Sequence, residues 1–152
     1  WTESMAMLET VHDAMRYNWN AYLWWYIRRF YSFIGDGEYG NVRGAILKRG
    51  YAFSHFAKEV RPGYQRVSAV ADNASSLMIT AYSGEGKTVV VIINPLSSDV
   101  SDVQINVPGT VPSARAYTTS EFMNIQEQVG LTTDAGVRIN LPAKSITTVV
   151  ME

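Results

Sequence analysis

The sequence changes character at Arg61-Pro62-Gly63-Tyr64, and this change constrains the fold more than any other feature. Before it, apolar residues recur at helical spacing between short apolar runs, which is typical of βα units. After it, short β-branched and aromatic runs are separated by polar turn residues, which is typical of an antiparallel sandwich. We therefore predict an α/β segment at residues 1–63 and an all-β domain at residues 64–152.

The first segment is predicted to hold two helices and a strand. Met5, Leu8, Val11 and Met15 recur with a helical period and form one apolar stripe. The predicted elements are a helix at 5–17, a buried strand at 22–27, a glycine-rich loop at 35–44 and a helix at 49–60. With Glu3 at the end of an earlier strand, this order suggests the last two βα units of a (β/α)₈ TIM barrel.

The second segment is predicted to be an antiparallel side β-sandwich. Turn residues such as Ser83-Gly84-Glu85-Gly86 and Pro108-Gly109 separate its apolar runs. Seven strands are predicted, at residues 67–71, 77–82, 88–94, 103–107, 114–119, 137–141 and 146–151.

The composition excludes several classes of protein. The chain has 152 residues, of which 47% are hydrophobic and 18% charged, as in a folded domain. Its net charge of −1 gives no attraction to nucleic acid or to anionic lipid. It has no cysteine, and its two histidines lie far apart without an acidic cluster, so we expect no metal and no cofactor. No apolar run approaches the roughly 20 residues that a membrane span needs.

Residues 1–31 carry the chemistry. Glu3 is followed by an amphipathic helix and then by a run rich in Trp, Tyr and Arg at residues 20–31. A carboxylate at a strand end, beside rings that can stack on sugar faces and arginines that can hold an acidic substituent, indicates a sugar-cleaving cleft. The commonest alternative for each residue is structural: a solvated carboxylate, packed rings, and arginines paired within the barrel.

Two blocks of sequence resemble a known family. The run Trp24-Trp25-Tyr26-Ile27-Arg28-Arg29, then Lys48-Arg49-Gly50-Tyr51, then residues 55–64, closely resembles the bacterial glucuronoxylan endoxylanases of glycoside hydrolase family 30. Residues 141–150 also look like the closing strand of that family. The similarity spans nearly the whole chain and is densest in residues 20–64.

This resemblance implies a retaining endo-β-1,4-xylanase made of a (β/α)₈ barrel and a side sandwich. Glu3 would be the catalytic nucleophile, at the C-terminal end of the seventh barrel strand. Trp25 would stack beneath the sugar at the cleavage point. Arg29 and Tyr31 would bind the carboxylate of a methylglucuronic acid branch. The general acid/base glutamate would lie on the fourth strand, upstream of this chain, and the parent enzyme would be secreted.

Two departures from the family concern the acid-binding pocket. The loop after Glu3 is short, so that Glu3-Ser4-Met5 runs almost directly into a helix. The loop after Tyr31 is instead longer and glycine-rich. We therefore expect relaxed or altered recognition of the branches on xylan.

The resemblance also implies that the chain is the C-terminal portion of a larger enzyme. Residues 1–60 alone would leave Trp24, Trp25 and the stripe of the first helix in water, at a cost of several kcal/mol. We expect upstream barrel strands to cover them, either in the same parent chain or in a separate fragment, and we expect this chain alone to be inactive. The alternative is a non-catalytic carbohydrate-binding or structural module with the sandwich as its working part, in which Tyr82, Tyr117 and Phe122 could form a sugar-stacking platform.

Overall fold

A computed structural model of the chain describes residues 1–72, 76–129, 131–133 and 136–152. Two helices come first, α1 (Thr2–Arg16) and α2 (Lys48–Ala57), and the strands follow. The strands are β1 (Gln65–Val67), β2 (Met78–Gly84), β3 (Lys87–Asn94), β4 (Val100–Ile105), β5 (Ala114–Thr119), β6 (Gln126–Gln128), β7 (Thr132–Thr133), β8 (Gly136–Leu141) and β9 (Ser145–Met151).

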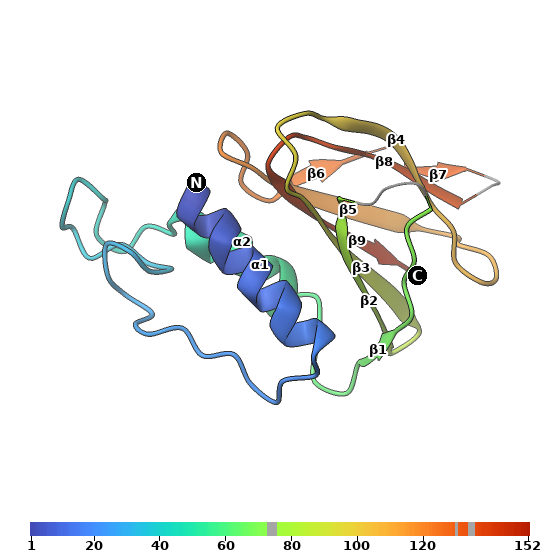
Figure 1. Cartoon of the computed structure of the whole chain (residues 1–152), viewed down its shortest axis with the longest axis horizontal. Helices are drawn as coiled ribbons and strands as arrows, with labels where there is room; N and C mark the ends of the chain where they lie inside the picture. The colour runs from blue at the N-terminus through green and yellow to red at the C-terminus, as the bar shows by residue number, and fades with distance from the viewer. Residues whose placement is uncertain (73–75, 130, 134–135) are drawn as a thin grey trace.

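The strands form two antiparallel sheets. The larger sheet has the order β1-β2-β3-β9-β5-β6, and the smaller one has the order β4-β8-β7. The small sheet lies across one face of the large sheet, and the two helices lie across the other face (Figure 1). The predicted sandwich is therefore present in the described residues.

The alternation of side chains along β3 explains the layers. Val89, Val91 and Ile93 join the cluster that α1 and α2 cover. Val90 and Ile92 belong to the cluster shared with β4 and β8. Successive side chains of a strand point to opposite faces, so a central strand covered on both faces must be apolar throughout.

The apolar stripe of α1 is buried by the sheet. Met5, Met7, Leu8 and Val11 are at most 5% exposed and share one cluster with Phe56 of α2 and with the large sheet. The expectation that this stripe needs upstream strands for cover is wrong. The two helices pack on the sandwich, so this hydrophobic cluster crosses the predicted boundary at residue 63.

The predicted strand at residues 22–27 is also wrong. Residues 17–47 are irregular and contain only isolated bridges, from Arg28 to Ile34 and from Ile34 to Ile46. A strand forms when a neighbouring strand pairs its backbone groups, and the described residues offer no such neighbour here. The barrel part of the predicted fold is accordingly not formed within the described chain.

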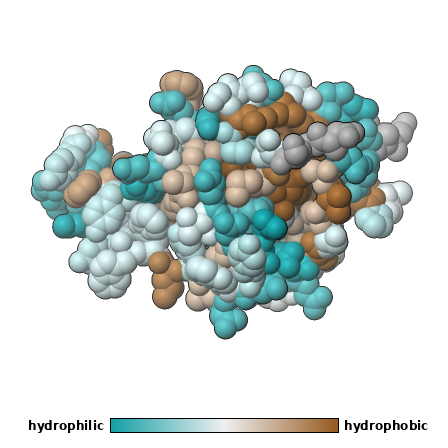
Figure 2. All heavy atoms as spheres, viewed as in Figure 1, coloured by the Kyte–Doolittle hydropathy of each residue, from teal (hydrophilic) through white to brown (hydrophobic). Residues whose placement is uncertain are grey.

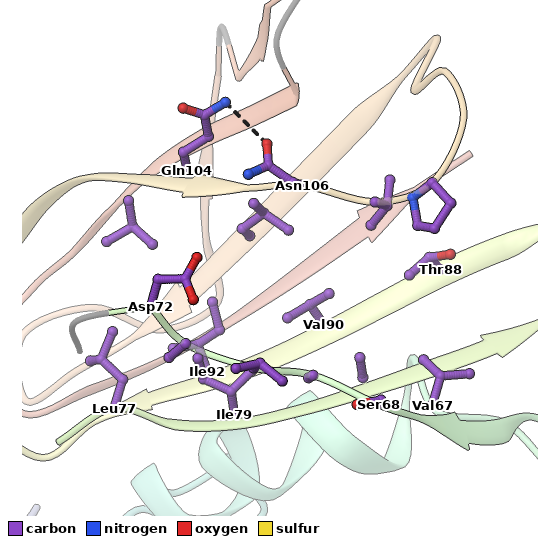
Figure 3. A pocket seen from close by; sticks show the side chains of 18 of the residues that line it. Val67, Ser68, Asp72, Leu77, Ile79, Thr88, Val90, Ile92, Gln104 and Asn106 are labelled. Carbon is purple, nitrogen blue, oxygen red and sulfur yellow. Dashed lines mark hydrogen bonds between the residues drawn. The ribbon is translucent and has the colours of Figure 1, made fainter. Parts of the chain in front are cut away.

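A pocket of about 650 Å³ opens between the two sheets. Its floor is the apolar face of β2 and β3, with Ile79, Val90 and Ile92, and its wall is β4 with the residues after it (Figure 3). Brown, hydrophobic side chains accordingly gather over this half of the molecule in Figure 2. The described lining contains no aromatic ring and none of the predicted site residues, so this pocket is not the predicted sugar cleft.

Candidate functional site

Glu3 lies in the first turn of α1 rather than at the end of a strand. This placement corrects the sequence-based one, because the helix begins at Thr2, three residues earlier than its apolar stripe indicated. The Trp1 indole donates a hydrogen bond to the carbonyl oxygen of Lys144 (2.7 Å), which fixes the start of the helix on the sandwich. The Glu3 side chain itself is 81% exposed and available to a ligand.

Arg49 connects Glu3 to the aromatic segment. Its Nη2 forms an ion pair with Oε2 of Glu3, and its Nη1 donates to the carbonyl oxygen of Tyr31. The guanidinium carbon lies 5.4 Å from the ring centroid of Trp24. The Arg49 side chain is only 14% exposed, so the cation is held in place between the helix and the segment. Gly50 permits this close approach, because a Cβ there would lie 2.7 Å from the carbonyl oxygen of Phe33.

Arg49 is the site residue that the sequence reasoning missed. It lies in the family-like run Lys48-Arg49-Gly50-Tyr51, but the sequence pattern alone did not assign it a function. One signal could have identified it, since a cation in the first turn of a helix is disfavoured by the helix dipole unless a carboxylate compensates. Glu3 is that carboxylate in the structure.

Trp24 and Trp25 point in different directions, as adjacent residues of the predicted strand at 22–27 also would. Trp24 stacks on Phe33 with ring centroids 5.9 Å apart, whereas Trp25 is 75% exposed. In a strand, Tyr26 would share the side of Trp24. Its ring instead lies 4.5 Å from that of Trp25 and is 43% exposed. The expected two-residue alternation fails because the segment is not a strand.

The other two predicted substrate ligands, Arg29 and Tyr31, lie just before Ser32 in the chain. The guanidinium of Arg29 is 5.7 Å from the ring centroid of Tyr26. Tyr31 is half-buried, and its carbonyl oxygen is the acceptor from Arg49. Buried Ser32 donates its hydroxyl hydrogen to the carbonyl oxygen of Tyr26 and so holds the two halves of the segment together. The structure thus brings the four predicted site residues together in two pairs: Arg49 connects Glu3 with the carbonyl oxygen of Tyr31, and the ring of Tyr26 lies near both Trp25 and Arg29.

The histidines are structural. The His55 ring nitrogens lie 2.8 Å from the Thr148 hydroxyl and 2.9 Å from the Thr119 hydroxyl. Burial, with a smaller contribution from Lys58, lowers the pKa of His55 to about 3. Burial also lowers the pKa of His12, with Arg16 adding to the effect. Among the described residues, no group of three or more potential ligands is placed to hold a metal ion.

The suggested platform on the sandwich is not assembled. Tyr82 is 3% exposed and belongs to the core under the helices, whereas Phe122 is 90% exposed. Tyr117 instead lies beneath the ammonium of Lys58, 5.3 Å from its ring centroid. In the part of the chain that the structure covers, neither helix is long and apolar enough to cross a membrane.

Comparison with known proteins identifies relatives of the chain. No protein-family model matches it. It is 36% identical over 154 residues to glucuronoxylanase XynC of Bacillus subtilis. The aligned region covers 100% of this chain and 35% of that protein. The chain thus spans about a third of the length of this relative.

Solved structures give the same relationship. An endoxylanase of glycoside hydrolase family 30 from Clostridium papyrosolvens C71 matches with a TM-score of 0.85 and 34% identity, over 98% of this chain and 38% of that one. A xylanase of family 30, subfamily 8, from Clostridium acetobutylicum also has a TM-score of 0.85, with 26% identity, over 99% of this chain and 38% of that one.

These relationships place the relatives of the chain among the glycoside hydrolases, and the similarity extends over the full chain. Within that class, its relatives are the endoxylanases of family 30, and the chain fits a C-terminal portion of such an enzyme. The resemblance indicated by the Trp24–Arg29 and Lys48–Tyr51 blocks is therefore confirmed.

Proposed function

We propose that this chain is the C-terminal portion of a secreted, retaining endo-β-1,4-xylanase, with Glu3 as its nucleophile. The observation that carries the proposal is the exposed carboxylate of Glu3, paired with an arginine that also binds the Tyr31 segment. Secretion follows from the substrate, since xylan is a polymer too large to enter a cell. Residues 1–63 would belong to the barrel and residues 64–152 would form the side sandwich.

Two carboxyl groups share the reaction. With Arg49 engaging Oε2, the other oxygen of Glu3 attacks the anomeric carbon and forms a glycosyl-enzyme ester while the glycosidic bond breaks. A glutamate outside this chain protonates the leaving oxygen and then takes a proton from the water that hydrolyses the ester. The two carboxyl groups must lie about 5–5.5 Å apart for this retaining chemistry. One of the two belongs to the missing part, so the chain alone is inactive.

The exposed aromatic segment would bind the polysaccharide. Trp25 offers an open ring face to the sugar at the cleavage point. Arg29 and Tyr31 would hold the carboxylate of a glucuronic acid branch, for which a guanidinium is suited because it donates two parallel hydrogen bonds. The altered loops after Glu3 and after Tyr31 favour relaxed dependence on that branch. The chemistry uses only carboxylates and water, so we propose no cofactor.

The missing barrel strands are the partner that the proposal requires. Leu23, Trp25 and Ile27 are 90%, 75% and 66% exposed, respectively. Apolar side chains gathered at this density on one segment mark a surface that another part of a protein, or a ligand, covers. Upstream strands, in the parent chain or in a separate fragment, would cover these side chains and complete the barrel.

Hydrolysis of xylan by the complete enzyme tests the proposal. We expect Glu3→Gln to lower turnover at least about a thousandfold, because the substitution removes a group that acts in the transition state. Glu9→Gln is the matched control, since Glu9 is an exposed carboxylate on the same helix, and it should leave turnover unchanged. Turnover of Glu3→Gln near that of the wild type would refute the assignment.

A further inference from the structure

The glycine-rich loop at residues 35–44 has a defined conformation. The Gly37 amide donates to the Asn41 side chain (2.9 Å), and the Glu38 amide donates to the Asp36 carboxylate (3.1 Å). The Gly44 amide donates to the carbonyl oxygen of Gly35 (2.8 Å), which closes the base of the loop. Because its conformation is set before a ligand arrives, the loop can present a side chain at little further entropic cost.

Gly35 is the residue that makes this closure possible. A Cβ at that position would lie 2.3 Å from the carbonyl oxygen of Val42 and 2.5 Å from Oδ1 of Asn41. Partial burial opposes ionisation of Asp36, but hydrogen bonds from Glu38 and Asn41 outweigh it and lower the pKa of Asp36. The carboxylate that holds the loop is therefore charged at neutral pH. Figure 1 shows this part of the chain projecting from the helices, away from the two sheets.

Three rings run from the loop to the site. Tyr39 is 84% exposed, and its ring centroid lies 4.3 Å from that of Phe30 at an interplanar angle of 49°. Phe30 is 40% exposed and meets Tyr31 edge-on, with centroids 5.0 Å apart. Tyr31 in turn accepts the hydrogen bond from Arg49, the partner of Glu3. The rings thus form a continuous series from the loop to Tyr31, whose backbone carbonyl contacts the arginine that is paired with the proposed nucleophile.

We propose that Tyr39, supported by Phe30, forms a further sugar-binding subsite, which stacks on a pyranose ring of the xylan backbone at a distance from the cleavage point. This proposal rests on the proposed function. Pyranose rings present apolar C–H faces to aromatic rings, and a neighbouring ring that holds Tyr39 in place lowers the entropic cost of that stacking. The open ring of Tyr39 has no core to join, because the loop lies outside both hydrophobic clusters.

The position of the subsite determines which substrates it affects. A short oligosaccharide that fills only the sites near Glu3 does not reach the loop. A long one covers Tyr39 both before and during the reaction, so the contact contributes equally to the ground state and the transition state. Loss of such a contact raises KM and leaves kcat unchanged.

The test uses the complete enzyme with Tyr39→Ala and linear xylo-oligosaccharides of two lengths. We expect KM for the long substrate to rise by up to about tenfold with kcat unchanged, and KM for the shortest cleaved substrate to stay the same. Tyr39→Phe should restore the wild-type values, because stacking needs the ring and not the hydroxyl group. Phe122→Ala is the matched control, as an equally exposed ring on the sandwich.

Two results would overturn the subsite. One is an unchanged KM for long substrates in Tyr39→Ala. The other is an equal change for short and long substrates, which would assign Tyr39 to loop stability or to another partner. Titration of the 152-residue chain with a long xylo-oligosaccharide, before and after Tyr39→Ala, separates this proposal from the larger one. Loss of binding with Tyr39→Ala supports the subsite even if Glu3→Gln leaves hydrolysis intact.

Discussion

Two apolar runs of this chain, Val89–Ile93 in β3 and the segment at 22–27, have opposite outcomes. Every residue of the first run is at most 5% exposed. In the second run, Leu23, Trp25 and Ile27 are more than half exposed. β3 pairs with β2 on one edge and β9 on the other, whereas no strand of the described residues pairs with residues 22–27. Hydrophobicity alone therefore does not bury an apolar run. The run also needs neighbouring strands that form hydrogen bonds with its backbone.

We expect the largest effect on stability from a substitution where the two helices pack on the large sheet. Phe56 is 2% exposed and packs in the cluster under both helices. Phe56→Ala should lower the free energy of unfolding of the chain by about 3–5 kcal/mol, through lost burial and the cavity left behind. Equilibrium urea denaturation measures this difference.

Leu23→Ala provides the matched control, because Leu23 is 90% exposed on the aromatic segment. Its effect should stay within about 0.5 kcal/mol. Should Phe56→Ala fail to fold, the smaller change Phe56→Leu should still destabilise the chain more than Leu23→Ala does. Equal effects at the two positions would contradict the expectation that the buried cluster contributes more to stability than the exposed segment does.

An intermediate effect is expected from acid. The pKa of His55 is about 3 in the folded chain and near 6.5 in the unfolded chain, so the neutral ring favours folding. This contribution is fully present above pH 6.5 and is lost as the pH falls from 6.5 toward 3. The free energy of unfolding should fall by up to about 1.4 kcal/mol per pH unit in that window.

The measurement is urea denaturation of the chain between pH 7.5 and pH 4.5. His55→Gln keeps polar atoms near Thr119 and Thr148 but cannot take up the proton, so its slope with pH should be shallower. If the free energy of unfolding changed with pH by the same slope in both proteins, His55 would not be the acid-sensitive contact between α2 and the sheet.

The smallest effect sharpens the comparison within the aromatic segment. Trp25→Ala should change the free energy of unfolding by no more than about 0.5 kcal/mol, because the ring is 75% exposed. Trp24→Ala should cost more, since Trp24 packs on Phe33 and beneath Arg49. Urea denaturation of both variants decides the matter, and a larger cost for Trp25→Ala would show that the two rings were assigned the wrong way round.

The sandwich was largely predictable from the sequence. The predicted bounds agree with β5, and those of β3 and β9 differ by one residue at a single end. Their β-branched runs and flanking turns carry a strong signal. β6 and β7 were missed because they are very short: Gln126–Gln128 is polar throughout, and Thr132–Thr133 has two residues.

The roles of the candidate site residues stay predictions, and the backbone geometry that presents them was not predictable from the sequence. The side chains of Glu3, Trp25 and Arg29 were identified from residue type and resemblance, and the structure leaves the first two open to solvent. Their backbone was misassigned because a strand depends on partners that lie elsewhere in the sequence or outside it. The role of Arg49 was missed for a similar reason, since its contacts with Glu3 and Tyr31 span 46 and 18 residues.

Trapping the covalent intermediate would identify the residue that attacks the sugar. A 2-fluoro xylobioside with a good leaving group would be added to the complete enzyme, because such a sugar forms the glycosyl-enzyme ester but hydrolyses slowly, and the labelled peptide would be mapped by mass spectrometry. We expect one sugar adduct per enzyme, on Glu3. An adduct on another carboxylate, with Glu3 unmodified, would contradict it.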